Sequence, residues 1–260
     1  MQTILFHETI FGPIHSRRLG TSLGVNLSPA DGKICSFDCI YCEAGYNAQG
    51  PGKAGMPPRT EVARLLDEKL SAMHAAGEHL DVITFSGNGE PTLHPEFAGI
   101  VDDTIALRDK YFPEVKISVL CNSTQLHRPD VVEALRRVDN NILKLDSAVE
   151  QTMRRMDRPG SPSFTVEKVI GQLEHFGHNA IIQTMLTRGE HGGVVVDNTT
   201  PGEIDALIEA YRRIGPREVM IYTIDRPTPE LSLKRIPVDE LRAAADRITA
   251  ATGIPVQVSA

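Results

Sequence analysis

The sequence predicts an α/β fold, and within that class a partial (β/α)6 TIM-like barrel. Extended apolar runs alternate with amphipathic stretches about six times, which is typical of parallel strands joined by right-handed helical crossovers. The chain has 260 residues, close to the ~250 residues of one (β/α) barrel. Because about six units are fewer than the eight that close a full barrel, we expect an open sheet within a single domain that spans residues 1–260.

The predicted strands are short runs rich in β-branched residues. They are centred near Gly24, Val82, Val119, Leu143, Ile182 and Met220. Between them, amphipathic segments predict helices, several of which begin with a proline that suits the first helical turn. The predicted helices cover residues 61–76, 95–110, 129–137, 165–176, 201–214 and 237–251. Two stretches rich in Gly, Pro and polar residues, 47–58 and 189–200, are predicted to be loops.

The composition is that of a globular protein without a strong charge preference. Hydrophobic residues make up 41% of the chain and charged residues 23%, which is enough to bury a core. The net charge of −7 gives no overall attraction to phosphate backbones or anionic lipid, so nucleic acid is possible as a partner but not favoured. The sequence shows neither a signal peptide nor a run of about eighteen apolar residues, and we expect a cytoplasmic protein with no membrane association.

Three of the four cysteines, Cys35, Cys39 and Cys42, lie close together on a loop after the first predicted strand. In a cytoplasmic protein such crowding indicates a metal site rather than disulfides. Three thiolates at this spacing can each bind a different iron of a [4Fe-4S] cluster and leave the fourth iron open. An open iron can bind and activate a molecule, as the open position of a catalytic zinc does.

Apolar and aromatic residues lie between these ligands, at Phe37, Ile40 and Tyr41. Their packing would limit water around a cluster and influence its potential. The alternative is a zinc site or a structural cluster completed by Cys121 or a nearby histidine.

The pattern CxxxCxxC, with Tyr41 before the last cysteine, resembles the signature of the radical S-adenosylmethionine (SAM) superfamily. The resemblance implies that the three cysteines hold a [4Fe-4S] cluster whose open iron chelates the amino and carboxylate groups of SAM. It also implies that an electron from the cluster cleaves SAM to methionine and a 5′-deoxyadenosyl radical, which abstracts hydrogen from a substrate. A reductant such as flavodoxin or ferredoxin would supply the electron.

A glycine-rich turn ends the second predicted strand, where the loops of a parallel barrel form the ligand face. It comprises Gly87, Asn88, Gly89, Glu90 and Pro91. The stretch resembles the GGEP motif that binds the SAM amino group in this family, with Asn88 in place of the first glycine. Taken alone, ordinary turn chemistry explains such a stretch. Its position one strand after the cysteine loop favours SAM binding.

The alternation of side chains along the remaining strands indicates which residues face the barrel interior. This parity directs Asn122 inward, as a SAM contact, and Cys121 outward, as a buried packing thiol. Lys144 and Asp146 share the inward parity, and they either contact SAM or substrate or form a salt bridge that satisfies itself. The other candidates for contacts with SAM or substrate are Gln183, Thr184, Tyr222, Asp225 and Arg226.

Two groups of arginines stand outside these motifs. Arg17 and Arg18 precede the first predicted strand, and residues 153–158 include three more. We interpret both groups as solvated surface charge, with an anionic substrate or the acidic face of a reductase as the alternative partner.

Residues 12–20, 86–95 and 222–226 resemble a subgroup related to the wyosine-forming tRNA enzymes. Those relatives use a second cluster on three further cysteines, whereas this chain has one cysteine left. We therefore expect a radical SAM enzyme that acts on a small molecule or a peptide, with no catalytic residue assigned beyond the cofactor site. The alternatives are a tRNA-modifying enzyme of the wyosine-forming type and a non-enzymatic iron-sulfur or zinc redox sensor.

Overall fold

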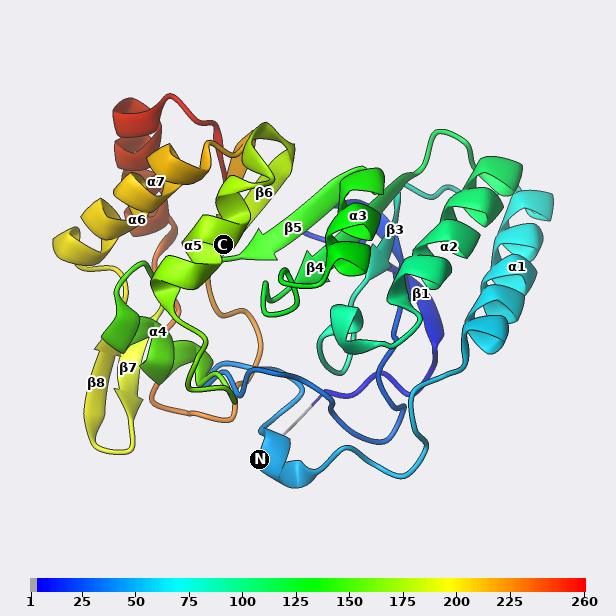
Figure 1. Ribbon diagram of the computed structural model, residues 1–260, viewed down its shortest axis with the longest axis horizontal. Coiled ribbons are helices and arrows are strands. Elements are labelled where there is room, and N and C mark those ends of the chain that lie inside the picture. The colour runs from blue at the N-terminus through cyan, green and yellow to red at the C-terminus, as the bar shows by residue number, and fades with distance from the viewer. Residues whose placement is uncertain (1–3) are drawn as a thin grey trace.

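The computed structural model describes residues 4–260, which form one large curled sheet with helices on its outer side (Figure 1). The sheet has eight strands in the order β1-β2-β3-β4-β5-β6-β9-β10. Only β1 pairs antiparallel, and all other neighbours are parallel. These strands are β1 (Ile10–Ser16), β2 (Gly20–Val25), β3 (Val82–Phe85), β4 (Lys116–Cys121), β5 (Asn140–Lys144), β6 (Ala180–Met185), β9 (Glu218–Tyr222) and β10 (Val256–Ser259). The predicted partial barrel is confirmed.

The helices follow the strands and pack against one another in chain order. Contacts join α1 to α2, α2 to α3, α5 to α6 and α6 to α7, so that α1 to α3 lie at one end of the sheet and α6 and α7 at the other (Figure 1). The helices are α1 (Arg59–Ala75), α2 (Phe97–Tyr111), α3 (Pro129–Arg137), α4 (Glu150–Asp157), α5 (Val166–Glu174), α6 (Pro201–Ile214) and α7 (Val238–Thr252), with short 3-10 turns at η1 (Asn47–Gln49), η2 (Pro91–Leu93) and η3 (Gly177–Asn179). None of the helices within residues 4–260 combines the length and apolar character needed to cross a membrane.

The six predicted strands correspond to β2, β3, β4, β5, β6 and β9, but four further strands and one further helix were not predicted. β1 and β10 extend the sheet at its two edges. The prediction of a loop over residues 189–200 is wrong, because β7 (Arg188–His191) and β8 (Val194–Asp197) form an antiparallel hairpin there. The unpredicted helix is α4, which lies beside this hairpin.

Two hydrophobic clusters occupy the two faces of the sheet because side chains alternate along each strand. The larger cluster lies between the sheet and the helices, where for example the rings of Phe85 and Phe97 meet edge to face with centroids 6.0 Å apart. A small cluster of Ile142, Ile181 and Met220 fills part of the inner face. The outer cluster therefore contributes most of the apolar burial, and the inner face is left free for polar side chains.

The curl of the sheet brings its two edges near one another. In the turn between β1 and β2, the Arg18 carbonyl accepts a hydrogen bond from Gln257 Nε2 of β10 at 3.3 Å. The neighbouring Arg17 guanidinium donates to the Ala260 carbonyl at 2.8 Å. Residues that are more than 230 positions apart in the chain thus join the two edges of the sheet, with Arg18 and Gln257 at the base of the barrel, where the parallel strands begin, and Ala260 directly after the carboxyl end of β10.

We expect the outer core to dominate stability. Leu70 of α1 is fully buried in it, so Leu70→Ala should lower the free energy of unfolding by about 2–5 kcal/mol through lost burial and a residual cavity. The same change at Leu231, whose side chain is 87% exposed, should alter it by less than about 0.5 kcal/mol. Urea denaturation of both variants measures the difference. Equal losses in the two variants would show that α1 is not packed as described.

Candidate functional site

The cysteine loop follows β2 and lies at the carboxyl ends of the parallel strands, packed against the glycine-rich turn. Ile34 and Gly89 form an isolated parallel bridge. The Ile34 N–H donates to the Asn88 carbonyl at 3.3 Å, and the Glu90 N–H donates to the Ile34 carbonyl at 3.0 Å. The two motifs of the sequence are therefore joined through their backbones.

The other side of the cysteine loop rests on the carboxyl-terminal end of α4. The Ile40 N–H donates to the Met156 carbonyl at 2.9 Å, and the Asp38 N–H donates to the Asp157 carbonyl at 3.0 Å. These bonds satisfy carbonyls that a helix end leaves without intrahelical partners. The unpredicted helix α4 is thus a structural support of the loop.

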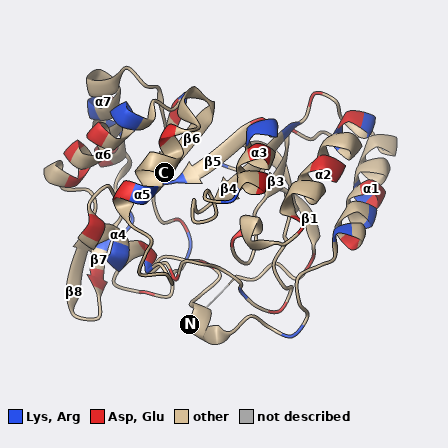
Figure 2. Cartoon of the chain, viewed as in Figure 1, with Lys and Arg blue, Asp and Glu red and all other residues tan. Residues whose placement is uncertain are grey.

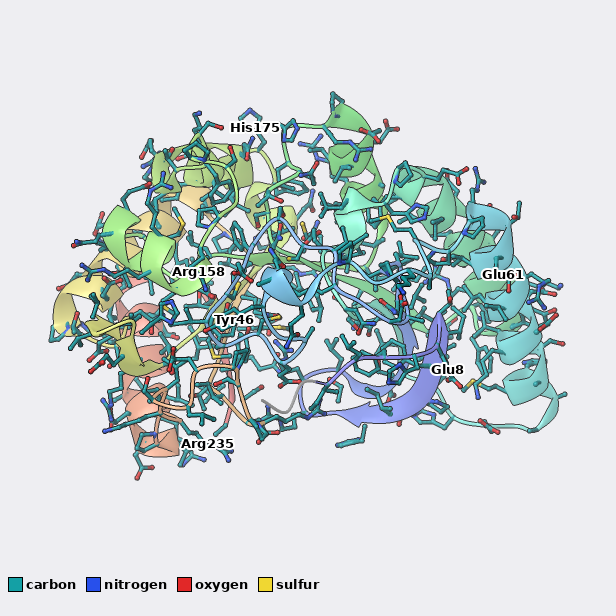
Figure 3. The ribbon with its side chains drawn as sticks, turned by 90° about the horizontal axis from the view of Figure 1, so that it is seen from below. Glu8, Tyr46, Glu61, Arg158, His175 and Arg235 are labelled. Atoms are coloured by element: carbon teal, nitrogen blue, oxygen red, sulfur yellow. The ribbon has the colours of Figure 1, made fainter. Side chains whose placement is uncertain are left out.

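Arg158, directly after α4, adds a side-chain contact to this support. Its guanidinium carbon lies 5.1 Å from the ring centroid of Tyr46, and Nη2 lies 3.3 Å from the Asp38 carboxylate. The two labelled side chains lie near one another in the view from below (Figure 3). Arg158 therefore ties α4 to the cysteine loop, whereas the sequence suggested a solvated charge.

Apolar packing surrounds the cysteines. Phe37, Ile40 and Tyr41 are buried in a cluster of their own with Met156 and Met185. This arrangement limits the access of water to the loop, which is one means by which a protein sets the potential of a cluster.

The three cysteines of the loop are free thiols with the surroundings of metal ligands. Burial raises the pKa of Cys35 to about 11 and that of Cys39 well above its usual value. These thiols need a nearby cation to become thiolates, and a metal supplies one. Asn122 Nδ2 donates to Cys35 Sγ at 3.5 Å, a contact of the kind that orients a metal ligand. The residues present therefore fit an iron-sulfur cluster.

Within residues 4–260, no group of three His, Cys, Asp or Glu side chains has the arrangement to hold a metal ion. In a cubane each thiolate binds its own iron, so the three sulfurs need not converge on one point. Cys121 is buried in the outer core with an exposed fraction of 3%, as strand parity predicted.

The glycine-rich turn is shaped by its own packing. A Cβ at Gly89 would lie 1.9 Å from the Ile34 carbonyl oxygen, and one at Gly87, where φ is +149°, would lie 2.3 Å from Asn26 Oδ1. The Asn88 amide points away from the strand ends and binds the backbone of Phe6 and Pro29. Asn88 thus replaces a glycine at a position where its side chain anchors the amino-terminal segment.

Glu90 is almost fully buried, and its carboxylate is occupied by the chain itself. Oε1 accepts from the Thr92 N–H at 3.1 Å, and Oε2 accepts from the Asn122 N–H at 2.6 Å. Burial raises the pKa of Glu90, and these hydrogen bonds oppose that rise. The carboxylate joins the ends of β3 and β4, so the backbone of the turn is left as the part that can meet a ligand's ammonium.

A charged network lies behind the cysteine loop. Lys144 Nζ lies 2.5 Å from Asp146 Oδ2 and 3.0 Å from Asp157 Oδ1, and it also contacts the Tyr41 hydroxyl. Cys39 Sγ lies 3.8 Å from Asp157 Oδ1. The network therefore links the lining of the barrel to one of the three cysteines.

Two carboxylates share the one ammonium of this network. Burial by itself lowers the pKa of Lys144, but Asp146 and Asp157 outweigh it and raise that pKa well above its usual value. Burial raises the pKa of Asp157 to about 8, although Lys144 opposes the rise. The remaining oxygen of Asp146 accepts from the Met185 N–H at 2.9 Å. Lys144 and Asp146 thus form the predicted salt bridge, and a contact with SAM stays a prediction.

A cavity of about 410 Å³ opens inside the curled sheet between these elements. Its lining includes Gly87 and Gly89 of the turn, Glu43 directly after the last cysteine, and Arg18 from the base of the barrel. This volume falls within the range of small-molecule sites. The carboxyl ends of parallel barrel strands are where such sites form.

Two predicted residues meet beside Arg18, which lines this cavity. Gln183 Nε2 donates to the Tyr222 hydroxyl at 3.0 Å, and Gln183 Oε1 accepts from Arg18 Nη1 at 2.7 Å. Thr184, by contrast, faces the helices and bonds the Tyr211 hydroxyl at 2.6 Å. The interpretation of Arg18 as a solvated surface charge is wrong, because the turn between β1 and β2 carries it into the cavity.

Residues 31–192 match the model of the Radical SAM superfamily. The chain belongs to this superfamily. Members of the radical SAM family bind a [4Fe-4S] cluster and SAM, so the expected enzyme class and cofactors are confirmed. The match spans both the cysteine loop and the glycine-rich turn. The relation to the wyosine-forming subgroup stays a prediction.

Individual proteins show the same relationship. A UPF0026 protein of Helicobacter pylori (strain J99) is 28% identical over 229 residues, which are 86% of this chain and 70% of that protein. A radical SAM methyltransferase from Sphaerobacter thermophilus has a TM-score of 0.65 at 14% identity, covering 92% of this chain and 65% of that one. Streptococcus suis SuiB bound to its precursor peptide SuiA has a TM-score of 0.64 at 13% identity, covering 94% and 50%.

The likeness to these two solved structures is a likeness of fold, a partial barrel. This chain spans about half to two thirds of their length.

Sequence reasoning missed one residue of the site, Asp157, and preferred the wrong interpretation of another, Arg18. Asp157 lies at the carboxyl end of α4, where the helix dipole disfavours a carboxylate. This unfavourable position points to a special role for Asp157, but it can be recognised only when helix α4 is known. For Arg18 the sequence offered an anionic substrate as the alternative, but it could not decide for it, because the surroundings of Arg18 come from β6 and β9.

We expect the contact between turn and loop to control cluster loading. Gly89→Ala would force a Cβ against the Ile34 carbonyl and should destabilise the protein by about 1–3 kcal/mol while lowering the iron bound after reconstitution. Gly171→Ala in α5, where a Cβ meets nothing within 4 Å, should be neutral or stabilising by up to about 1 kcal/mol. Iron analysis and urea denaturation test both. Normal iron content in a Gly89→Ala protein of unchanged stability would contradict the contact.

Proposed function

We propose that this chain is a radical SAM enzyme that acts on a small molecule or a peptide. One observation carries the proposal: the backbone bridge between Ile34 and Gly89 holds the cysteine loop against the glycine-rich turn, beside a cavity of about 410 Å³. When bound, the cluster and SAM supply a 5′-deoxyadenosyl radical that abstracts hydrogen from the substrate. The protein's part is to hold, orient and shield these groups.

In this proposal Cys35, Cys39 and Cys42 are the cluster ligands. The thiols are the only ligand type in the loop that matches iron-sulfur chemistry. Cys121 is not a ligand, because it is buried on the opposite face of the sheet among helix residues. The fourth iron is thereby left for SAM.

The SAM site in this proposal is formed by the turn and by side chains inside the barrel. The backbone of the turn receives the amino group, and the strand ends receive the ribose and the carboxylate. The residues assigned to this site are Tyr41, Gly87, Asn88, Gly89, Glu90, Pro91, Asn122, Lys144, Asp146, Gln183 and Tyr222. Tyr41, Lys144 and Asp146 act as one hydrogen-bonded unit, which fixes the side chains before a ligand arrives.

The charge pattern supports a substrate other than nucleic acid. Lys and Arg alternate with Asp and Glu on the outer helices (Figure 2), and many are paired, as Arg64 is with Glu61 and Glu68. A phosphate-binding surface would gather basic residues on one face.

We include in the proposal a reductant such as flavodoxin or ferredoxin, a cytoplasmic location that keeps the thiols reduced, and residues 1–260 as a single domain.

The expected result after anaerobic reconstitution is about four irons per chain and release of 5′-deoxyadenosine upon addition of dithionite and SAM. Cys39→Ala should lose most of the iron and all of this release, because one corner of the cluster has no ligand. Cys121→Ala is the matched control, and it should keep both because Cys121 is buried in the outer core, where its sulfur accepts a hydrogen bond from the Ser123 N–H at 3.2 Å, and it is not a cluster ligand in this proposal. Iron and sulfide analysis, electron paramagnetic resonance with and without SAM, and chromatography provide the readouts.

Two outcomes would overturn the proposal. A fully loaded wild-type protein whose spectrum is unchanged by SAM, and which releases no 5′-deoxyadenosine, would indicate a redox sensor. Loss of iron in Cys121→Ala comparable to that in Cys39→Ala would indicate a fourth protein ligand.

A further inference from the structure

The base of the cavity is formed by the turn between β1 and β2. Arg18 and Leu19 line the cavity of about 410 Å³ and also a second one of about 680 Å³ at the amino ends of the strands. Leu19 packs against the inner cluster of Ile142, Ile181 and Met220. The turn therefore separates the two cavities, and Arg18 lies at the floor of the one that faces the cysteine loop.

Arg18 is held in a fixed orientation by two neutral groups. Its Nη1 donates to Gln183 Oε1 at 2.7 Å, and its guanidinium carbon lies 4.6 Å from the ring centroid of Tyr222. Gln183 Nε2 donates to the Tyr222 hydroxyl at 3.0 Å, which turns the amide oxygen toward Arg18. Stacking on an aromatic face is a common way to position a guanidinium.

The charge of Arg18 lacks a counterion in the described structure. The other two arginines of the cavity are paired, Arg17 with Asp225 at 3.4 Å and Arg226 with Glu43 at 3.0 Å. No ion pair within residues 4–260 includes Arg18. Burial raises the pKa of Tyr222 to about 12, so its phenol is neutral at physiological pH. Burial also lowers the pKa of Arg18, which means that the site penalises this charge.

A partly buried charge is unfavourable unless a partner of opposite sign reaches it. The three arginines that line the cavity outnumber its two carboxylates. A guanidinium also offers a planar fork of donors that matches an oxyanion, and only one of its N–H groups is engaged by the chain within residues 4–260. The cavity is thus prepared for an anionic group at its floor.

We propose that Arg18 binds an oxyanion of the substrate, a carboxylate or a phosphate group, so that the enzyme acts on an anionic molecule whose charged end rests on the turn between β1 and β2. This assignment rests on the proposed function. Arg18 is a binding residue in this scheme, because it fixes the position of the substrate beneath the SAM site. Gln183 and Tyr222, which the proposed function places in the lining of the SAM site, also position the guanidinium.

The test is an anion titration of cluster-loaded protein at constant ionic strength, with chloride as the balancing ion and the thermal unfolding midpoint as readout. The probes are inorganic phosphate and, separately, malonate, which distinguish a phosphate site from a carboxylate site. At a probe concentration about tenfold above its dissociation constant, binding should raise the unfolding midpoint of the wild type by about 3–5 °C. The variants are Arg18→Gln, Arg18→Lys and the exposed control Arg242→Gln.

The expected result is a saturable shift in wild type and Arg242→Gln that is lost in Arg18→Gln and weakened several-fold in affinity in Arg18→Lys. Any non-saturable rise shared by all four proteins is the general effect of excluded salts. The absence of a saturable shift in wild type overturns the proposal, and so does an undiminished shift in Arg18→Gln. If Arg18→Gln does not fold, wild-type affinity in Arg18→Lys overturns it.

A second measurement distinguishes whether Arg18 binds the substrate or SAM. Equilibrium dialysis of loaded protein with labelled SAM should give a dissociation constant for Arg18→Gln within about threefold of wild type. A loss of tenfold or more would show that Arg18 holds the carboxylate of SAM, which overturns the assignment to the substrate. Failure of wild type to release 5′-deoxyadenosine would overturn the proposed function instead, and it would leave the anion titration unaffected.

Discussion

The site depends on the backbone hydrogen bonds that hold the cysteine loop on both sides. Ile34 pairs with the glycine-rich turn after β3, and Ile40 pairs with the end of α4. A loop of this length has many conformations when free, and each ordered residue costs about 1–2 kcal/mol of backbone entropy. These bonds offset that cost and fix the positions of the three thiols relative to the cavity. The glycine at position 89 is needed because the two backbones approach so closely.

Charge balance around the loop follows from the same arrangement. The end of α4 that supports the loop also places Asp157 beside Lys144 and Cys39. Lys144 is thereby held between two carboxylates and the Tyr41 hydroxyl, next to the place where thiolates would gather negative charge on a cluster. One lysine thus links the structural support of the loop, the lining of the barrel and the proposed cluster site.

The two faces of the sheet have different roles. The outer face carries the large hydrophobic core, and substitutions of residues in this core affect the stability of the protein. The inner face has a small apolar cluster at its base and polar groups above it. Arg18 lies at the boundary between them, stacked on Tyr222. The lining of the cavity therefore extends from Arg18 at its floor to the glycine-rich turn and to Glu43, directly after the last cysteine. In our proposal, a molecule held at the floor points its other end toward the SAM site.

The sequence by itself determined the parallel strands, most helices and the two motifs, because periodicity, capping and ligand spacing are local properties. The helix at 129–137 was predicted at its true bounds because Pro129 stands at its first position, and the helix at 201–214 because Pro201 begins it and Gly215, at φ 63°, ends it. Strand β1 was missed since Gly12 and Pro13 lie within it, residues that argue against a strand.

Only the tertiary structure decided the support by α4 and the environment of Arg18. The bond from Arg18 to Gln183 joins residues 165 positions apart, and it exists because the sheet curls until the first turn lies beneath β6 and β9. No local pattern encodes that curl, which results from strand twist summed over the whole sheet. The sequence therefore specified the cysteine loop and the glycine-rich turn, and the curl of the sheet specified that Arg18 lines the same cavity as that turn.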